Sequence, residues 1–236
     1  MTSEHSNLFL ASLPAEDKDA ILACAQRVAL PIGTVLHESG ERPGFAHFMT
    51  SGLTSIVTVM ADGTGTEVGL IGREGLVEAV DLIGPMPPPT RAFIQVEGSA
   101  LRVRFADLEK FVLSSPGFRQ RLLQSVQCQT FILSQLTACN GLHQIEERLA
   151  RWLLMVQDRL ESERFYLTQE FLADMLGARR TSVTLAAGSL QHSGIIQYRR
   201  GHIHIVDREG LQDVACECYP IARDLLLNQY QSSVVR

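Results

Sequence analysis

The chain has 236 residues, of which 45% are hydrophobic and 20% are charged, and its formal net charge is -5 at pH 7. This composition is typical of a globular protein with a packed core, and the length allows one large domain or two ordinary ones. The sequence has no apolar run of about 18 residues and no basic start of a secretory signal, which excludes a membrane span and export. We therefore expect a cytoplasmic protein without a membrane partner, whose five cysteines are reduced thiols.

The amino-terminal half is predicted to form a small β-domain. A short helix is expected from Ala15 to Ala29, and short strands joined by turns are expected from Arg27 to Phe105. Apolar and polar residues alternate toward an Asp62-Gly63 turn, and two more strands flank Gly98. Strands at this spacing indicate an antiparallel barrel or roll.

The period of the apolar residues changes from strand to helix after Pro116. Asn140-Gly141 is expected to break the resulting long helix, and a second amphipathic helix follows. The stripe of the long helix consists of Phe118, Leu122, Val126, Leu133 and Leu136. The apolar side of the second helix consists of Leu142, Ile145, Leu149, Trp152, Leu153 and Val156.

Two short helices with a tight turn between them are predicted after Arg164. Thr168 is a good N-cap for the first helix, and Gly177 ends it and permits the turn. The second helix buries positions i, i+3, i+4 and i+7, which is typical of a helix-turn-helix that presents its second helix to the major groove of DNA. These four positions are Val183, Ala186, Ala187 and Leu190.

The outward side of this second helix is polar and basic at its amino end. A two-stranded wing is expected after Gly194, with a turn at Arg200-Gly201; Ile203 and Ile205 face inward, and His202 and His204 face outward. Charges beyond about 8–10 Å are screened, so a local basic face suffices for DNA binding by an acidic chain. From Arg164 to Val206 the acids are only Glu170 and Asp174, against Arg164, Arg179, Arg180, Arg199 and Arg200.

Other function classes have less support. The sequence lacks GxSxG, HExxH and Walker patterns, so we assign no catalytic residue and expect no enzyme. The alternative function is a carrier or scaffold that holds a small, cyclic-nucleotide-like ligand in the roll and does not bind DNA. The outward pair Arg179-Arg180 argues against this alternative, although one arginine pair alone is usually a solvated surface.

We also expect no cofactor and no metal. Only Cys24 lies in the amino-terminal region, which is too few cysteines for an iron–sulfur cluster, and His37 and His47 are expected to be ordinary histidines rather than haem ligands. Cys128 and Cys139 on the long helix are expected to be small buried hydrophobic residues.

A zinc site is the remaining alternative in the carboxy-terminal region. It would combine Cys216 and Cys218 with His202 and His204, but this spacing is not that of a standard zinc motif. The role of the two cysteines stays open at this point.

Along almost its whole length the chain resembles the catabolite activator/FNR (Crp/Fnr) superfamily of bacterial transcription regulators. NLFLASLPAEDKDAIL is similar to the family's amino-terminal segment, and IGREGLVEAVDLIG followed by RAFIQVEGSALRV is similar to its cyclic-nucleotide-binding roll. LGARRTSVTLAAGSLQHSGII is similar to the recognition motif. The resemblance implies an α+β fold with a jelly-roll-like β-roll, a long dimerisation helix and a carboxy-terminal winged helix-turn-helix. The corresponding ranges are 1–115, 116–140 and 141–212, followed by a tail at 213–236.

The resemblance also implies a homodimer on a near-palindromic operator, an effector response through the roll, and RNA polymerase as a partner. Arg180 keeps the place of the family's base-reading arginine, whereas Arg179 replaces the usual serine at the start of the helix. Thr181 and Leu185 stand where many or some members carry glutamate and arginine, so the operator is expected to differ from the best-known ones. The expected DNA contacts are Thr168, Gln169, Arg179, Arg180, Thr181, Ser182, Thr184, Leu185, Arg199 and Arg200.

The candidate effector pocket departs from the family pattern. Cyclic-nucleotide binders carry Gly-Glu where this chain has Glu78-Ala79, so the carboxylate that holds the ribose hydroxyl is absent. Arg91 keeps the phosphate arginine, but Ala92 replaces the usual hydroxyl residue, and nearby prolines remove amide donors. An apolar or anionic small ligand, or none, is expected instead of a cyclic nucleotide.

Overall fold

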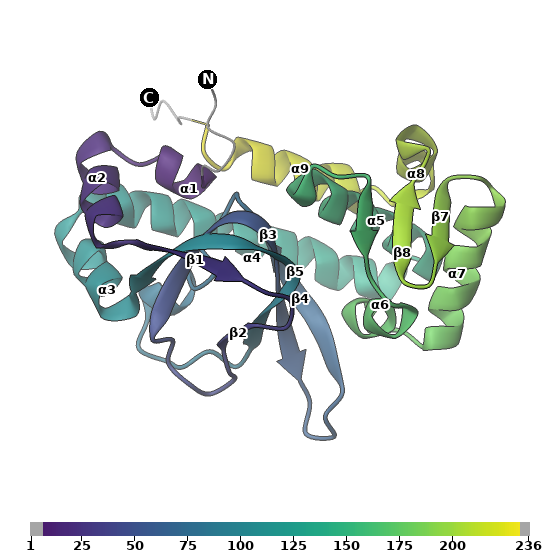
Figure 1. Ribbon diagram of the computed structural model, residues 1–236, viewed down its shortest axis with the longest axis horizontal. Coiled ribbons are helices and arrows are strands. Elements are labelled where there is room, and N and C mark those ends of the chain that lie inside the picture. The colour runs from purple at the N-terminus through teal and green to yellow at the C-terminus, as the bar shows by residue number, and fades with distance from the viewer. Residues whose placement is uncertain (1–6, 232–236) are drawn as a thin grey trace. The chain divides into compact units, whose positions relative to one another are not determined.

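The computed structural model describes residues 7–231, whose elements group into two compact units (Figure 1). The first unit comprises the chain up to Ile56, Gly69–Phe131, and the chain from Asp224 onward; the second comprises Val57–Val68 and Ile132–Arg223. These boundaries do not coincide with the expected ranges 1–115, 116–140, 141–212 and 213–236, which stay a prediction. None of the helices between residues 7 and 231 is long and apolar enough to cross a bilayer.

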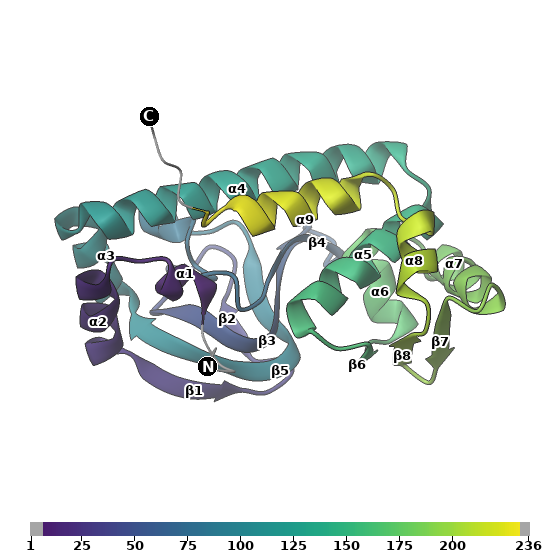
Figure 2. The ribbon, with the colours of Figure 1, turned by 90° about the horizontal axis from the view of Figure 1, so that it is seen from above.

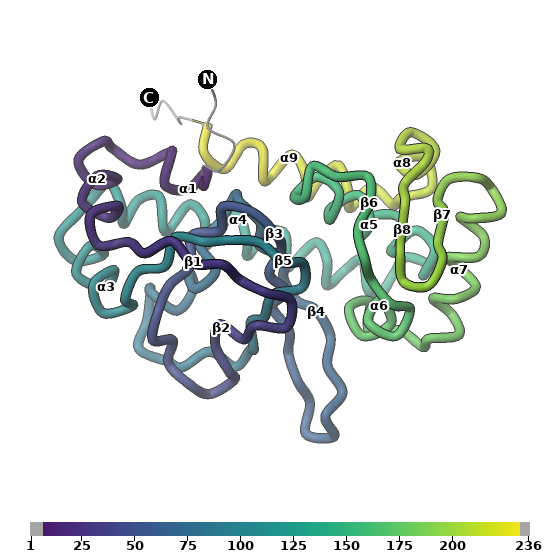
Figure 3. The backbone as a smooth tube through the Cα atoms, viewed as in Figure 1, coloured from purple at the N-terminus to yellow at the C-terminus, as the bar shows by residue number. Residues whose placement is uncertain are grey.

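The first unit contains an antiparallel roll, as the sequence predicts. Its strands are ordered β1-β5-β3-β4, and β2 pairs with β5. Figure 3 allows the backbone to be followed through the roll. The elements from the amino end are α1 (Leu8–Ala11), α2 (Ala15–Cys24), β1 (Gln26–Leu30), β2 (Val35–His37), β3 (Phe45–Val59), β4 (Gly65–Ile71), the 3-10 turn η1 (Asp81–Ile83), β5 (Arg91–Arg104), α3 (Phe105–Ser114) and α4 (Pro116–Leu142).

The predicted helix from Ala15 to Ala29 is too long. Helix α2 ends at Cys24 because Ala25 is extended, and the next five residues form β1. This strand pairs antiparallel with β5, from Gln26 opposite Arg102 to Leu30 opposite Gly98. The ladder with β5 thus decides the conformation of residues that helix periodicity alone assigned to α2.

The first turns of α4 belong to the core of the roll unit. Phe118 and Leu122 are fully buried in one cluster with Phe9 and Phe48. The Phe9 ring lies 5.7 Å from the Phe118 ring and 5.8 Å from the Phe48 ring, between centroids. The apolar stripe predicted for α4 is therefore covered at its amino end by the chain itself.

The break predicted at Asn140-Gly141 is wrong by two residues. Helix α4 continues to Leu142, which is 81% exposed and does not join the apolar side of the next helix. Gly141 has open space around it, and a glycine inside a helix costs only about 1 kcal/mol relative to alanine. The next helix begins at Ile145 after the N-cap Gln144, whose backbone amide donates a hydrogen bond to the Glu147 carboxylate at 2.8 Å as part of a capping box.

The second unit contains helices packed with a small three-stranded sheet of order β6-β8-β7. The strand β6 was not predicted from the sequence; Phe165 at its centre is buried opposite Ile203. The elements are α5 (Ile145–Leu160), β6 (Arg164–Tyr166), α6 (Gln169–Leu176), α7 (Arg180–His192), β7 (Ile196–Arg199), β8 (His202–Ile205), α8 (Arg208–Val214) and α9 (Cys218–Asn228).

Within the segment expected to form a tail, Cys218–Asn228 is helix α9, and residues 232–236 lie outside the described residues. Helix α9 runs beside α4 (Figure 2), where Gln135 donates a hydrogen bond to the Cys218 sulfur and Cys128 donates one to the Leu225 carbonyl. Cys218 and Tyr219 are buried, and the Tyr219 hydroxyl donates to Asp158 at 2.9 Å. Buried contacts of this kind show that the segment after Val214 is part of the fold.

We predict that Gly98→Ala lowers the free energy of unfolding by about 1–3 kcal/mol, the usual cost of overpacking. A Cβ atom at position 98 would lie 2.2 Å from the Ser51 carbonyl oxygen, where strand β3 passes β5 closely. Urea unfolding of the full chain measures this cost. Gly141→Ala is the control, because its Cβ meets no atom within 4 Å and should stabilise the helix by about 0.5–1 kcal/mol. Equal effects of the two substitutions would contradict the steric argument.

Candidate nucleic-acid interface

Helices α6 and α7 form the predicted helix-turn-helix. The Thr168 hydroxyl accepts a hydrogen bond from the Phe171 amide at 3.2 Å and so caps α6. Gly177 ends α6 in the left-handed conformation, with φ of 55°, and the Ala178 amide closes the turn on the Ala173 carbonyl at 2.9 Å. The four predicted core positions of α7 are all buried, namely Val183, Ala186, Ala187 and Leu190.

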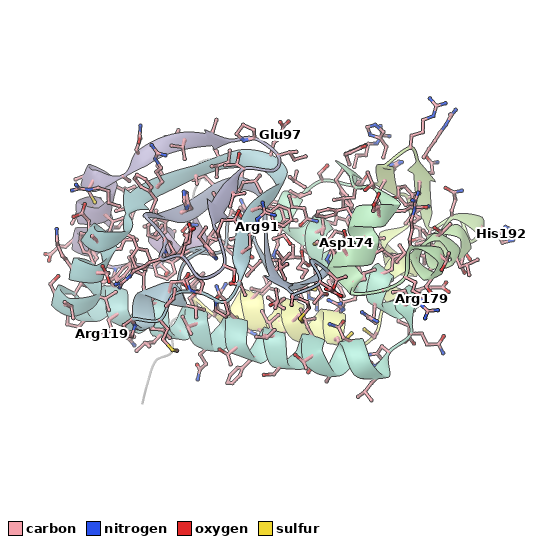
Figure 4. All side chains as sticks on the ribbon, turned by 90° about the horizontal axis from the view of Figure 1, so that it is seen from below. Arg91, Glu97, Arg119, Asp174, Arg179 and His192 are labelled. Atoms are coloured by element: carbon pink, nitrogen blue, oxygen red, sulfur yellow. The ribbon has the colours of Figure 1, made fainter. Side chains whose placement is uncertain are left out.

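The amino end of α7 presents its polar side to solvent. Arg179 is the N-cap and makes no side-chain capping bond, and Arg180 begins the helix (Figure 4 labels Arg179 and, at the other end, His192). Both arginines are exposed, and within residues 7–231 neither guanidinium forms an ion pair or hydrogen bond. The unpaired amide groups at a helix start add a partial positive charge. This end of α7 is therefore suited to bind an anion such as a phosphate.

The start of α6 lies beside the outward face of α7. The Thr184 hydroxyl donates to Gln169 Oε1 and to the Arg180 carbonyl, each at 2.9 Å. Leu185 is 76% exposed, Thr181 is exposed, and Ser182 is half-buried. The residues expected to contact DNA on α6 and α7 are thus brought onto one surface by the fold.

The wing predicted after Gly194 is present as the hairpin β7–β8. Its turn places Arg200 at φ 50° and Gly201 at φ 84°, and Arg199 pairs with His202 across the strands. Ile203 and Ile205 are buried, as predicted. Arg199 and Arg200 are both exposed at the tip.

Contacts within the second unit hold the wing against the start of α6. The Tyr198 hydroxyl donates to the Leu167 carbonyl at 2.7 Å, and the Tyr166 ring lies 5.1 Å from the His202 ring. Gly201 is required at the turn because a Cβ there would lie 2.5 Å from the Tyr166 ring. The wing arginines therefore have a defined position relative to the helix-turn-helix.

The four candidate effector residues in the roll do not gather into one polar site. Ala79 and Ala92 are both fully buried, but they belong to two different hydrophobic clusters. Arg91 forms an ion pair with Glu38, with Nε 3.2 Å from Oε2, and lies over the Phe93 ring. This pairing occupies the arginine that the family resemblance assigns to a ligand phosphate.

Glu78 is fully buried in a network of charged and polar groups. Its carboxylate accepts hydrogen bonds from the His47 amide at 2.8 Å and contacts His47 Nδ1 at 2.9 Å. Burial opposes ionisation of this carboxyl group, yet the charge of His47, its hydrogen bonds and the nearby His37 ring, whose Nδ1 lies 4.0 Å from Oε1, lower the pKa of Glu78 below the usual value. Burial, together with the nearby charge of Glu78, raises the pKa of Asp81 to about 6. Glu78 is therefore committed to the interior of the roll.

Two further polar side chains inside the roll were not expected from the sequence. Gln95 is buried on β5, and among residues 7–231 its amide makes no hydrogen bond; the same holds for Nε2 of buried His37. Buried polar groups are normally paired, so such atoms often face a bound molecule or water. Both side chains are isolated polar residues in apolar strands, a pattern that marks no function by itself.

The carboxy-terminal cysteines meet partners that differ from those considered in the sequence. Cys216 and Cys218 lie with Cys139 and His143, not with His202 and His204. His202 packs on Tyr166, and His204 faces Gln197 and Glu163. The only sequence signal for the actual group is the spacing of Cys139 and His143, one helical turn apart.

Comparisons with known proteins agree with this architecture. Residues 147–214 match the family model of the Crp-like helix-turn-helix domain. A CRP-like cAMP-activated global transcriptional regulator of Mycobacterium tuberculosis is 23% identical over 193 residues, which cover 79% of this chain and 86% of that protein.

Similar folds are found among solved structures. The structure of FixK2 from Bradyrhizobium japonicum has a TM-score of 0.70 at 17% identity. The matched region covers 81% of this chain and 98% of the FixK2 chain. The c-di-GMP responsive global regulator CLP of Xanthomonas campestris has a TM-score of 0.66 at 16% identity. The matched region covers 81% of this chain and 99% of the CLP chain. At these identities the likeness shows the fold.

Proposed function

We propose that the chain acts as a homodimer on a near-palindromic operator. The proposal rests on its family: the chain belongs to the Crp/Fnr family of DNA-binding transcription regulators, which are not enzymes. The observation that carries the proposal is the exposed Arg179-Arg180 pair at the start of α7, whose guanidinium groups make no ion pair or hydrogen bond within residues 7–231. We infer a cytoplasmic location, and RNA polymerase is the partner that the family suggests. The two half-sites would lie about 34 Å apart, one turn of DNA.

Roles within this surface follow from position. Arg180 lies on α7 beside Thr184 and Gln169, and its guanidinium suits the O6 and N7 atoms of a guanine. Arg179 precedes the helix and has a phosphate as the nearer partner. Arg199 and Arg200 at the wing tip extend the positive surface along the DNA backbone, and exposed Leu185 suits a thymine methyl group.

The proposed dimer uses only part of the apolar stripe predicted for α4. Because Phe118 and Leu122 are buried within the chain, they are not available for pairing. Leu133 of that stripe stays 43% exposed, and the other exposed large apolar side chains of α4 are Leu123 at 52%, Phe131 at 51% and, at its last residue, Leu142 at 81%. Two copies that cover these side chains along paired helices would form a two-fold interface.

The roll is the proposed sensor, but its chemistry favours a ligand other than a cyclic nucleotide. Ala79 leaves no carboxylate for a ribose hydroxyl, Glu78 is held by His47, and Arg91 is paired with Glu38. The unpaired amide of Gln95 and the unpaired Nε2 of His37, judged over residues 7–231, would suit a small polar ligand.

The first prediction here separates base reading from phosphate binding. Operators are first selected from random duplex DNA by the full chain, and affinities are then measured for the operator and for a version with a symmetric change at the guanine. Arg180→Ala should lose about 1–3 kcal/mol on the operator and lose the preference at that base pair. Arg179→Ala, the matched variant, should weaken all sequences equally and lower the salt slope by about one per half-site.

Two outcomes would contradict this assignment. If Arg180→Ala loses affinity equally for both duplexes, Arg180 is a phosphate contact. If the wild-type chain shows no salt-dependent binding to any duplex, the chain is a ligand carrier or scaffold rather than a DNA-binding regulator.

The second prediction concerns the dimer. Light scattering at micromolar concentration should give twice the chain mass of 26.1 kDa. Phe131→Asp should give monomers, because two phenylalanine side chains lose about 3–6 kcal/mol of burial together, which raises the dimer Kd at least about a hundredfold. Met86→Asp is the control, since this side chain is 81% exposed on the roll. A wild-type monomer that binds its operator tightly would exclude the proposed interface.

The third prediction concerns cyclic nucleotides. Adding cyclic AMP or cyclic GMP should leave the DNA affinity unchanged, since a ribose hydroxyl buried without a partner costs about 1–3 kcal/mol. The cAMP-activated regulator of Mycobacterium tuberculosis serves as the positive control in the same assay. Calorimetry that shows micromolar binding of either nucleotide to this chain would overturn the proposal.

A further inference from the structure

Four side chains able to ligate a metal converge where the end of α4 meets the start of α9. Their ligand atoms all lie within 4.8 Å of one another. The sulfurs of Cys139 and Cys216 are 3.5 Å apart, and the Cys218 sulfur is 3.6 Å from Nδ1 of His143. All three cysteines are buried, and all four residues belong to the second unit.

We propose that Cys139, His143, Cys216 and Cys218 bind one Zn²⁺ ion as a structural Cys3His site. Zinc–sulfur bonds of about 2.3 Å and zinc–nitrogen bonds of about 2.0–2.1 Å at tetrahedral angles separate two sulfurs by about 3.8 Å and a sulfur from a nitrogen by about 3.6 Å. The two observed distances agree with these values to within a few tenths of an ångström. These two pairs therefore already have the spacing that a tetrahedral site requires, and all four ligand atoms lie within 4.8 Å of one another.

The local backbone explains why these residues meet. Cys139 and His143 lie one turn apart, and the His143 amide donates to the Cys139 carbonyl at 3.1 Å, so both side chains share one face of the helix end. Cys216 and Cys218 flank a turn in which the Tyr219 amide donates to the Cys216 carbonyl at 3.0 Å. Each segment thus presents two ligands toward the other.

Groups around the four ligands match those of known zinc sites. Nε2 of His143 lies 3.2 Å from the Glu217 carboxylate, which holds its proton there and leaves Nδ1 free to face the sulfurs. A carboxylate behind a ligating histidine is the usual arrangement in zinc proteins. Gln135 donates an amide hydrogen bond to the Cys218 sulfur at 3.1 Å, an interaction that favours a thiolate.

The charge of the site also has a counterpart. One Zn²⁺ with three thiolates and a neutral imidazole carries a net charge of −1, and a buried charge needs an opposite one. Arg151 is only 3% exposed, and within residues 7–231 its Nε has no hydrogen-bond partner. Arg151 is close enough to the Cys139 sulfur to interact with it electrostatically.

Other occupants fit less well. Mg²⁺ and Ca²⁺ prefer oxygen ligands, and this set has only sulfur and nitrogen. Ligand atoms this close together surround a single ion and leave no room for an iron–sulfur cluster. A disulfide between Cys139 and Cys216 would give no role to the convergence of Cys218, His143 and Glu217.

The proposed zinc site goes beyond the proposed regulatory function. Its effect would be structural, because the ion would link two helices. A zinc ion bound there would tie the last turn of α4 to α9 beside α5, which carries Arg151. Since α5 packs on α6, α7 and α8, the ion would fix the base on which the helix-turn-helix is built. Structural zinc of this kind contributes directly to the stability of the fold.

Elemental analysis of the full chain, purified without a metal-affinity tag, tests the proposal. We expect one zinc per chain after dialysis, and a cobalt-substituted chain should show thiolate charge-transfer and tetrahedral d–d absorption bands. Cys139→Ser, Cys216→Ser and Cys218→Ser should each lose stoichiometric zinc, whereas Cys24→Ser and Cys128→Ser, the matched controls, should keep it. Glu217→Gln should retain zinc with an affinity about 10–100-fold lower.

A second measurement uses only the wild-type chain, so it tests the proposal even if the cysteine variants fail to fold. A strong chelator added to the wild-type chain should release zinc and lower Tm, and added zinc should restore Tm. A well-folded wild-type chain that contains no zinc and does not take it up would overturn the proposal, as would an iron–sulfur cluster or a Cys139–Cys216 disulfide in the purified chain. None of these results depends on DNA binding, so failure of the zinc site is distinguishable from failure of the proposed function.

Discussion

The structure depends on the burial of the 27-residue helix α4 at both of its ends. At its amino end, Phe118 and Leu122 are fully enclosed in the core of the roll unit. At its carboxyl end, Cys139 is fully enclosed in the second unit, together with Cys216 and Cys218. In proteins, helical stability comes mainly from tertiary packing rather than from propensity, so burial at these two ends stabilises α4 as one helix that continues through Asn140 and Gly141. A change in the roll or at the sulfur cluster therefore acts on one shared element.

The parts of the site that could be predicted from the sequence are those that local rules determine. The helix-turn-helix follows from a cap at Thr168, a left-handed glycine at 177, and core spacing in α7, all within about 25 residues. The wing follows from alternation about Arg200-Gly201. The end of α4 was misplaced because Asn140 and Gly141 are local signals, and tertiary burial of the neighbouring Cys139 outweighs them. Strand β6 was missed because three residues are too few to show alternation.

The sites in the roll and at the sulfur cluster were beyond prediction for a different reason. Their residues are far apart in the chain: Glu78 meets His47, and Cys139 meets Cys216, 31 and 77 positions away. No spacing in the sequence encodes such pairs, so Cys139 looked like a small hydrophobic residue and His47 like an ordinary surface or core histidine. Glu78 and Arg91 stand at positions that the family resemblance assigns to the ligand pocket, and in the structure they contact His47 and Glu38.

The acidic net charge of the chain is compatible with DNA binding, and it has a physical use. DNA responds to the charge within about a Debye length of its surface, where the exposed arginines of α7 and the wing dominate. Negative charge on the rest of the molecule repels the same polyanion, so encounters that begin on another surface are disfavoured. If the chain binds DNA as we propose, this contrast between the exposed arginines and the acidic remainder of the chain orients its approach, as complementary potentials do at other interfaces. The proposed positive surface would therefore act in two ways: through its contacts with DNA, and through the difference in charge between it and the rest of the chain.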